Sequence, residues 1–307
     1  MKSGFQAMIL AAGLGTRLRP HTLVRPKPLM PVLDRPLLLR AIDGLRRAGC
    51  GSLLVNAFHL REQISARLAD EPAVAVQMEE KELGTGGGLR RALSRFEPEP
   101  VLVVNGDIVH NIDYRQSYAR HLTEGNDATL VLHDSPRYNN VLTDPGGNIL
   151  AFGGGGGEGE QRLLAFTGLQ VINPALLELI PPDLFYSSIE WYRQLIAVGY
   201  RVRALVVKDH FWTDIGTPRD YLQLHASLLN GTTPLYQDEV AAAVSATVGG
   251  SLFCGSGVRL GREFSCRDWV VLGHNAVVGD RVTLSRCVVW DGVTVPSGTT
   301  AEEVVFS

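Results

Sequence analysis

The sequence predicts an α/β fold: a Rossmann-like, mixed and mostly parallel sheet with helices on both faces, followed by a short left-handed parallel β-helix. Two periodicities in the 307 residues indicate this fold. Up to about residue 230, short apolar runs typical of buried strands alternate with amphipathic helical patterns, as in sheets covered on both faces. After residue 245, apolar residues recur at every sixth position, the repeat of a parallel β-helix. We therefore expect two domains, residues 1–232 and residues 245–307.

The first predicted domain holds seven strand patterns and six helical patterns. In the helix predicted at residues 36–48, Leu38, Ile42 and Leu45 recur on one face, and Arg40 lies off this apolar stripe. The strands are expected at residues 7–10, 52–56, 74–78, 101–105, 128–133, 164–172 and 203–207. The helices are expected at residues 36–48, 60–68, 86–96, 114–122, 188–198 and 218–229.

Two apolar positions keep the six-residue register through the second predicted domain. The first set is Val248, Cys254, Leu260, Cys266, Leu272, Val278, Leu284 and Trp290. The second set is Leu252, Val258, Phe264, Val270, Ala276, Val282 and Val288. The repeat allows about three coils. Because it contains a single histidine, His274, a structural cap or a dimerisation surface is favoured over acyl transfer.

The composition is that of an ordinary globular protein. Hydrophobic residues make up 45% of the chain, which excludes a disordered, collagen-like or small disulfide-stapled protein. The net charge of −3 provides no general attraction to nucleic acid or to an anionic membrane. The four cysteines show no paired spacing, and no leader or membrane-spanning segment is recognised. We expect a cytoplasmic protein with buried thiols and without nucleic-acid or membrane partners.

A run of glycines at residues 153–157 and 159 stands apart from the strand and helix patterns. Glycines offer no side chains for packing, so the run is expected to be a mobile loop. A phosphate cradle is the alternative. It is disfavoured because no nearby pattern provides a fixed helix N-terminus.

The most informative segment follows the first predicted strand and runs to Pro28-Leu29. Gly13 and Gly15 allow backbone N–H groups to approach an anion and form a nest of donors. Arg17 can clamp phosphate oxygens in bidentate fashion, and Lys27 adds a compact positive charge. The spacing fits neither the dinucleotide-binding GxGxxG pattern nor a Walker A loop. The segment therefore predicts a phosphate site of another kind.

With these motifs the chain resembles the sugar-1-phosphate nucleotidyltransferases over nearly its whole length. The motifs are residues 13–29, Leu83-Gly84-Thr85-Gly86-Gly87-Gly88, Val104-Asn105-Gly106-Asp107, Phe166-Thr167-Gly168 and Trp212-Thr213-Asp214-Ile215-Gly216-Thr217. The resemblance implies transfer of a nucleoside monophosphate from an NTP to a sugar 1-phosphate, with Mg²⁺ and release of pyrophosphate. A left-handed β-helix at the C-terminus is common in this family.

The resemblance implies four catalytic residues. Arg17 would hold the β- and γ-phosphates, Lys27 would lie near the attacking sugar phosphate, and Asp107 and Asp214 would carry Mg²⁺. General chemistry agrees, because a sugar phosphate is already an anionic nucleophile near pH 7 and needs no general base. Such an enzyme must bring two anions together and neutralise the leaving pyrophosphate.

Further site residues follow from the resemblance alone. The expected nucleotide contacts are Leu10, Ala11, Ala12, Gly13, Gly15, Thr16, Arg17, Glu80, Thr85, Gly86 and Gly106. The expected sugar-phosphate contacts are Lys27, Asn140, Gly168, Ser187 and Lys208. Ala11-Ala12 favours UTP over GTP. Lys208 would replace a lysine that many relatives carry ahead of Thr167, and the alternative for Lys208 is a surface lysine at the end of a strand. Glu79 belongs to an acidic run for which the alternative to a ligand contact is exposure to solvent.

Within the family, the sequence is most similar to N-acetylmuramic acid 1-phosphate uridylyltransferases and to mannose- or heptose-1-phosphate guanylyltransferase-like proteins. A non-catalytic NDP-sugar-binding regulator or scaffold of the same fold is the alternative, although none of the four charged residues is missing. The coil end and the apolar tail Val304-Val305-Phe306 predict a homo-oligomer.

Overall fold

The computed structural model describes residues 4–154, 159–247 and 249–307. It forms two compact units, each built from several segments of the chain. The first unit comprises Met1–Leu14, Ala41–Gly106 and Ile112–Trp212; the second comprises Gly15–Arg40, Asp107–Asn111 and Thr213–Ser307. Gly155, Gly156 and Gly157 of the glycine run expected to be mobile, and Val248 of the repeat, lie outside the described residues. The division of the sequence at residues 232 and 245 stays a prediction.

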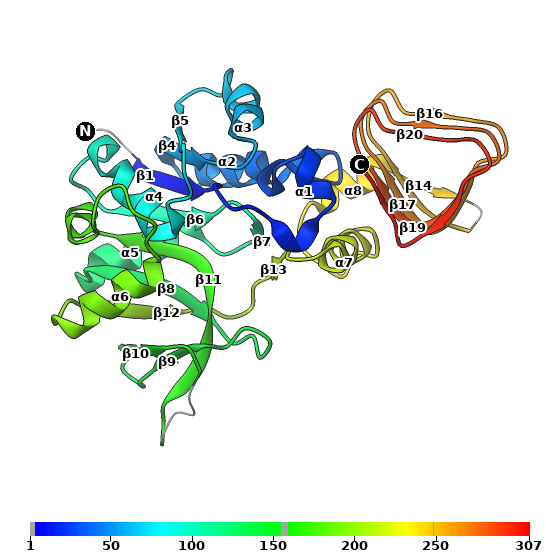
Figure 1. Ribbon diagram of the computed structural model, residues 1–307. Coiled ribbons are helices and arrows are strands. Elements are labelled where there is room, and N and C mark those ends of the chain that lie inside the picture. Colours follow the sequence, from blue (N-terminus) through cyan, green and yellow to red (C-terminus); the bar gives the residue numbers. More distant parts are fainter. Residues whose placement is uncertain (1–3, 155–158, 248) are drawn as a thin grey trace. The chain divides into compact units, whose positions relative to one another are not determined.

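A mixed sheet forms the centre of the first unit (Figure 1). Its strand order is β10-β9-β11-β6-β1-β4-β5, with β8 paired to β11 and β12 paired to β8. Strands β5, β4, β1 and β6 are parallel to one another, whereas β11 is antiparallel to its neighbours. The strands are β1 Phe5–Leu10, β4 Cys50–Ala57, β5 Val74–Met78, β6 Val101–Asn105, β8 Ala128–His133, β9 Val141–Thr143, β10 Ile149–Phe152, β11 Arg162–Ile172 and β12 Val202–Val206.

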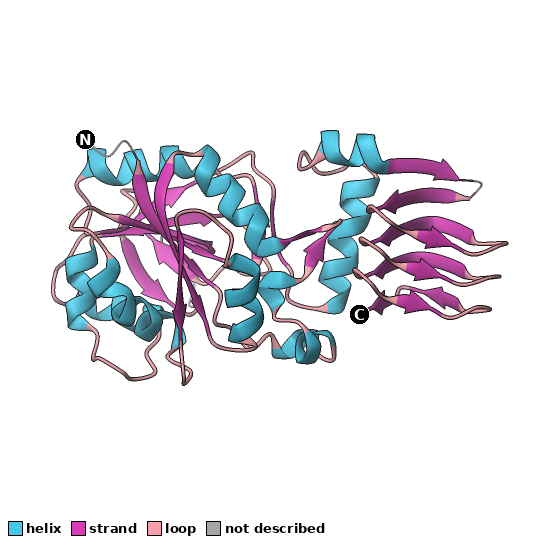
Figure 2. Ribbon diagram, turned by 90° about the horizontal axis from the view of Figure 1, so that it is seen from above, coloured by secondary structure: helices cyan, strands magenta, loops and turns pink. Residues whose placement is uncertain are grey.

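Helices lie on both faces of this sheet (Figure 2). They are α3 Arg61–Leu68, α4 Gly84–Ala92, η3 Leu93–Arg95, α5 Tyr114–Glu124, η4 Pro174–Leu179 and α6 Ser188–Ala197, and α2 Leu37–Arg47 runs from the second unit into the first. Every predicted strand and helix of this region is present, with small shifts at the ends. None of the helices in the described residues has the length and hydropathy required to span a bilayer.

The core of the first unit explains why its strands are almost wholly apolar. The first four residues of β6, Val101 to Val104, are all buried, because helices cover both faces of the sheet. Met8 and Leu54 of the neighbouring strands join the same cluster, together with Trp191 and Leu195 from α6.

The second unit begins with the segment that contains the predicted phosphate loop. Its short elements are η1 Thr16–Leu18, α1 His21–Val24, η2 Lys27–Leu29, β2 Pro31–Val32 and β3 Arg35–Pro36. Strand β7 (Ile108–His110) pairs with β13 (Trp212–Asp214). Two helices follow, α7 Pro218–Leu229 and α8 Gln237–Ala243. The sequence patterns predicted α7 but none of the other elements.

Short parallel strands fill residues 249–307, which we call the C-terminal strand stack (Figure 2). One sheet has the order β15-β17-β19-β21, with β22 also on β19, and a second has the order β16-β18-β20. Strand β14 (Val244–Thr247) is antiparallel to β15. The stack contains β15 Gly250–Cys254, β16 Arg259–Leu260, β17 Ser265–Leu272, β18 Val277–Val278, β19 Thr283–Val289, β20 Thr294–Val295, β21 Thr300–Glu302 and β22 Val305–Phe306.

The six-residue repeat corresponds to the interior of this stack. Leu272, Val278, Leu284 and Trp290 of the repeat are buried. Leu260 is 46% exposed, and Cys254, Val258 and Phe264 are only half-buried, so the apolar register alone did not determine burial. Two of the cysteines, Cys266 and Cys287, are buried free thiols, whereas Cys50 and Cys254 are only half-buried.

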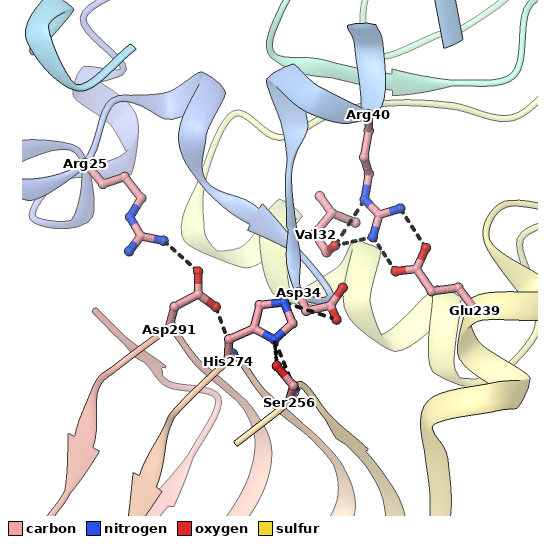
Figure 3. A network of polar contacts seen from close by, with 8 residues as sticks. All are labelled: Arg25, Val32, Asp34, Arg40, Glu239, Ser256, His274 and Asp291. Atoms are coloured by element: carbon pink, nitrogen blue, oxygen red, sulfur yellow. Dashed lines mark hydrogen bonds and ion pairs between the residues drawn. The ribbon is translucent and has the colours of Figure 1, made fainter. Parts of the chain in front are cut away.

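Arg40 is buried, contrary to the expectation from its place off the apolar stripe. Its Nε and Nη2 donate to the carbonyl of Val32, and both terminal nitrogens reach Glu239 in α8 (Figure 3). The guanidinium also lies 3.9 Å from the ring centroid of Tyr236. Paired donors and an aromatic face make the burial of a charge tolerable. Helical periodicity does not reveal such partners.

His225 in α7 links that helix to the loop segment of the second unit. The imidazole is fully buried; its Nδ1 donates to the Tyr221 carbonyl at 2.9 Å, and its Nε2 accepts from the Leu33 N–H at 3.0 Å. Burial lowers the pKa of His225 to about 4. The folded protein therefore holds this histidine neutral throughout the range near neutrality.

We predict a pH-dependent stability that depends on His225. Below pH 6.5 this histidine binds a proton in the unfolded chain but stays neutral in the folded protein. The free energy of unfolding therefore falls on acidification, and His225 accounts for a decrease of about 2 kcal/mol between pH 7 and pH 5. The His225→Gln variant lacks this contribution. Urea titrations at both pH values should show that the stability advantage of the wild type shrinks on acidification. Parallel pH curves for the two proteins would contradict the prediction.

Candidate active site

The four charged residues predicted to act together meet in the second unit. Arg17 lies in η1 and Lys27 begins η2, while Asp107 immediately precedes β7 and Asp214 ends β13. Because β7 pairs with β13, the two aspartates lie on neighbouring strands although 107 positions separate them in the sequence.

One ammonium group joins the two aspartates. Lys27 Nζ is 2.7 Å from Asp107 Oδ2 and 3.1 Å from Asp214 Oδ1. Lys27 is only 6% exposed, so these two carboxylates compensate a positive charge that has lost most of its water. Asp214 Oδ2 also accepts from Arg17 Nη2 at 3.4 Å. The side chain of Arg17 is 63% exposed, so most of its guanidinium faces solvent and is open to an anion.

Gly216 lies against the ends of two of these side chains. A Cβ at this position would lie 2.9 Å from Arg17 Nη1 and 2.9 Å from Asp214 Oδ2. Real Cβ atoms do not approach other atoms so closely, so any side chain would push the guanidinium and the carboxylate aside. The glycine of the Trp212–Thr217 motif is therefore explained by packing against the charged pair.

The two glycines of the predicted phosphate loop differ. Gly15 has φ +61°, and a Cβ at this position would lie 2.8 Å from Thr22 Cγ2; Thr22 Oγ1 in turn donates to the Gly15 carbonyl at 2.9 Å. Gly15 is therefore needed by the fold of the loop itself. Around Gly13, no atom of the described residues lies within 4 Å of a Cβ. Packing does not account for Gly13, which leaves its predicted role beside a ligand.

The donor set of Asp107 and Asp214 is compatible with Mg²⁺. The described residues contain no cluster of three or more His, Cys, Asp or Glu side chains suited to hold a metal. Mg²⁺ is commonly held by one or two carboxylates and by substrate phosphates, so a third protein ligand is not required. Both aspartates direct an oxygen toward the same ammonium, so their carboxylates converge on one place.

In the first unit, a buried polar cluster anchors the loop that follows β1. Asn56 Oδ1 accepts from the Ala11 N–H at 2.8 Å, and Asn56 Nδ2 donates to Glu79 Oε1 at 2.8 Å. Gln77 Nε2 donates to the same Glu79 oxygen at 3.1 Å and to the Gly88 carbonyl at 3.0 Å. Burial raises the pKa of Glu79. The cluster thereby fixes the backbone of Ala11, a predicted nucleotide contact.

This cluster was missed in the sequence, where Glu79 was grouped with an exposed acidic run. Glu79 is 0% exposed, while its neighbour Glu80 is exposed. The signal that was available is positional: Asn56 and Gln77 lie near the carboxyl ends of adjacent parallel strands, where polar side chains converge.

The glycines of α4 are required by close packing. A Cβ at Gly87 would lie 2.4 Å from the Leu184 carbonyl oxygen, and one at Gly86 would lie 3.1 Å from the Tyr186 carbonyl oxygen. The N–H groups of both glycines donate to Tyr186 O. Thr85 Oγ1 accepts from the Ser188 N–H at 3.0 Å, at the start of α6. Packing is therefore sufficient to explain the small residues of this motif. Its contact with the nucleotide base stays a prediction.

Of the other predicted site residues, all but Thr16 belong to the first unit. Gly106 donates its N–H to the Leu10 carbonyl at 2.9 Å. Gly168 has φ +82° within a register shift between β11 and β8. Ser187 is the N-cap of α6, where its side chain accepts from the Ile189 N–H, and Asn140 and Lys208 are exposed. No ligand contact is assigned to these residues.

Substitution Glu79→Gln is predicted to stabilise the protein at alkaline pH. Because burial raises the pKa of Glu79 above its ordinary 4.5, stability from this group is lost as the pH rises from that value. The neutral amide avoids this loss, and a gain of 1 kcal/mol would raise the Tm by about 2–4 °C. Thermal denaturation should show the gain at pH 8 and none at pH 4. The matched control, Glu82→Gln at an exposed position, should change neither value; an unchanged Tm for Glu79→Gln at pH 8 would refute the prediction.

Comparison with known proteins places these observations in a family. The mannose-1-phosphate guanylyltransferase catalytic subunit beta of Drosophila pseudoobscura pseudoobscura is 32% identical over 72% of this chain and 61% of its own length. The UTP–glucose-1-phosphate uridylyltransferase of Synechocystis sp. is 31% identical over 73% of this chain and 63% of its own length. The chain thus spans less than two thirds of the length of these two relatives.

A solved structure shares the fold of the sheet region. HddC from Yersinia pseudotuberculosis is matched with a TM-score of 0.62 and 25% identity, over 72% of this chain and 98% of that one. The family model described as nucleotidyl transferase matches residues 6–231, which include all four residues of the charged cluster. The chain therefore belongs to the nucleotidyl transferase family.

Proposed function

We propose that the protein transfers a nucleoside monophosphate from an NTP to a sugar 1-phosphate, giving an NDP-sugar and pyrophosphate. The observation that carries this proposal is the contact of Lys27 Nζ with both Asp107 and Asp214, beside the exposed guanidinium of Arg17. Relatives named as sugar-1-phosphate nucleotidyltransferases support the same reaction class.

The reaction is an in-line displacement that needs no general base. An oxygen of the sugar phosphate attacks the α-phosphorus of the NTP and forms a new P–O bond. The bond from that phosphorus to the bridging oxygen of the β-phosphate breaks, and its electron pair leaves with pyrophosphate. Since the nucleophile is already anionic, the task of the protein is to position two repelling anions and neutralise their charge.

Each charged side chain has a part in this scheme. Arg17 binds the β- and γ-phosphates with its exposed guanidinium, and Lys27 places its ammonium beside the attacking sugar phosphate. Asp107 and Asp214 hold Mg²⁺, which when bound neutralises triphosphate and pyrophosphate oxygens. In the first unit, the Ala11 amide held by Asn56 keeps the loop after β1 in one conformation for the nucleotide.

Two nucleotides remain candidates for the base. Ala11-Ala12 favours UTP, whereas mannose-1-phosphate guanylyltransferases are the more frequent names among the relatives with the greatest similarity. We therefore propose UTP with glucose 1-phosphate or an N-acetylhexosamine 1-phosphate, and GTP with mannose 1-phosphate, as the first pairs for assay. The residues proposed to determine the choice of sugar are Asn140, Gly168, Ser187 and Lys208.

The test is pyrophosphate release with UTP, GTP, CTP, ATP and dTTP against a set of sugar 1-phosphates, with Mg²⁺ present. We expect at least one pair well above background and a loss of activity on chelation with EDTA. Asp107→Ala should lower kcat by about 100-fold or more, because charge neutralisation at the leaving group is lost. Asp70→Ala, an exposed aspartate after α3, serves as the control and should retain activity.

Two results would count against the function. Release at background level with every pair would reject it, and binding of an NDP-sugar without turnover would favour the regulatory alternative. A loss of less than tenfold in Asp107→Ala would reject the metal role of that residue.

We further propose that the C-terminal strand stack winds as a left-handed parallel β-helix and provides a surface for self-association. Its six-residue repeat and its parallel strand pairing support the coil. Light scattering should give a mass of at least twice the 33.4 kDa of one chain. A monomeric mass at assay concentration would remove the proposed association.

A further inference from the structure

The segment that contains Lys27 is attached to the rest of the second unit on both sides of that residue. Arg25 precedes Lys27 by two positions, and Pro31 follows it by four. Each of the two has a contact that leads to Trp290 in the C-terminal strand stack. Trp290 has no part in the chemistry proposed above, and the sequence indicates only an apolar position of the repeat.

The attachment after Lys27 runs through two buried hydrogen bonds. Tyr221 in α7 donates its hydroxyl to the Pro31 carbonyl, and Trp290 Nε1 donates to the Tyr221 hydroxyl oxygen at 3.1 Å. Tyr221 and Trp290 are both among the fully buried side chains. Burial raises the pKa of Tyr221, so the phenol keeps the proton that it donates. This relay links a backbone carbonyl close to Lys27 to the indole.

The attachment before Lys27 uses the face of the same indole. The Arg25 guanidinium carbon lies 4.6 Å from the ring centroid of Trp290. Arg25 Nη1 is also 3.7 Å from Asp291 Oδ2, the residue next to Trp290 (Figure 3). A cation over an indole face and an ion pair with the adjacent residue both favour one place for Arg25.

Trp290 itself is fixed by the strand stack. It follows β19. Its backbone N–H donates to the Phe306 carbonyl at 2.9 Å, and its backbone carbonyl accepts from the Val293 N–H at 3.2 Å. A second contact between the stack and the loop segment lies nearby, where His274 Nε2 is 3.5 Å from Asp34 Oδ2 (Figure 3). The stack therefore anchors the loop segment at the end of β19, a strand paired on both sides.

We propose that Trp290 is a positioning residue for Lys27: one indole, fixed in the C-terminal strand stack, holds both ends of the segment that places the ammonium between Asp107 and Asp214. The role in catalysis rests on the function proposed above, while the role in placing Lys27 does not. A small displacement of a reacting or charge-neutralising group costs a large factor in rate, which makes such bracing useful. The opposing view is that Trp290 only fills the core, in which case its loss affects stability alone.

The test measures the accessibility of Lys27 directly. The chain has four lysines, Lys2, Lys27, Lys81 and Lys208, so acetylation by an N-hydroxysuccinimide ester can be followed site by site with mass spectrometry. In the wild type, Lys27 should react slowly because it is buried and paired with two carboxylates, and the exposed Lys81 and Lys208 are the internal standards.

Three variants remove different contacts of Trp290. Trp290→Leu removes both attachments, Trp290→Phe removes only the N–H donor, and Tyr221→Phe breaks only the hydrogen-bond relay. The acetylation rate of Lys27 relative to that of Lys81 should rise at least fivefold in Trp290→Leu and less in the two conservative variants. The matched control is Trp269→Leu, another buried tryptophan of the strand stack, which should leave the relative rate unchanged. If Trp290→Leu does not fold, Trp290→Phe and Tyr221→Phe decide the question.

Kinetics separate this inference from the proposed function. With an active pair of substrates, kcat should fall about tenfold in Trp290→Leu, while Trp269→Leu keeps kcat within twofold of the wild type at a comparable loss of Tm. Relative Lys27 rates within twofold of the wild type in all three variants would overturn the proposal, even if the enzyme is active. An inactive wild type would reject the proposed function and leave the labelling result to decide the placement of Lys27.

Discussion

The second unit is organised around one ammonium group shared by two carboxylates. Lys27 is buried, and without Asp107 and Asp214 its charge would be uncompensated. The same contact joins the turn before β7 and the end of β13 to η2, so three elements distant in the sequence meet at one charge.

The two units contain different kinds of predicted site groups. All four charged residues assigned to the reaction belong to the second unit, with α7, α8 and the C-terminal strand stack. The first unit offers mainly backbone groups, such as the loop after β1, whose Ala11 amide is held by Asn56. This division assigns charge neutralisation to one compact part of the chain and the backbone contacts predicted for the nucleotide to the other. It also gives the C-terminal strand stack a structural connection to the chemistry.

The sequence was sufficient for what depends on local pattern and motif. Periodicity predicted strands such as β5 and β6 and the limits of α7, and the motifs predicted that Arg17, Lys27, Asp107 and Asp214 belong together. It failed where burial depends on a partner far away in the chain. Arg40 is buried because Val32 and Glu239 accept its donors, and Glu79 because Asn56 and Gln77 donate to it. The anchoring of Arg25 on Trp290 likewise joins positions that no short-range pattern connects.

Gly216 bears on how the activity of other family members is inferred from their sequences. Any side chain there would wedge between the Arg17 guanidinium and the Asp214 carboxylate, and both charged residues would still be present in the sequence. A chain could thus keep every ionic residue of the motif set and yet lose the arrangement that makes them work. When a diverged copy is screened for lost activity, the small residue two places after the second aspartate should therefore be checked together with the charged residues.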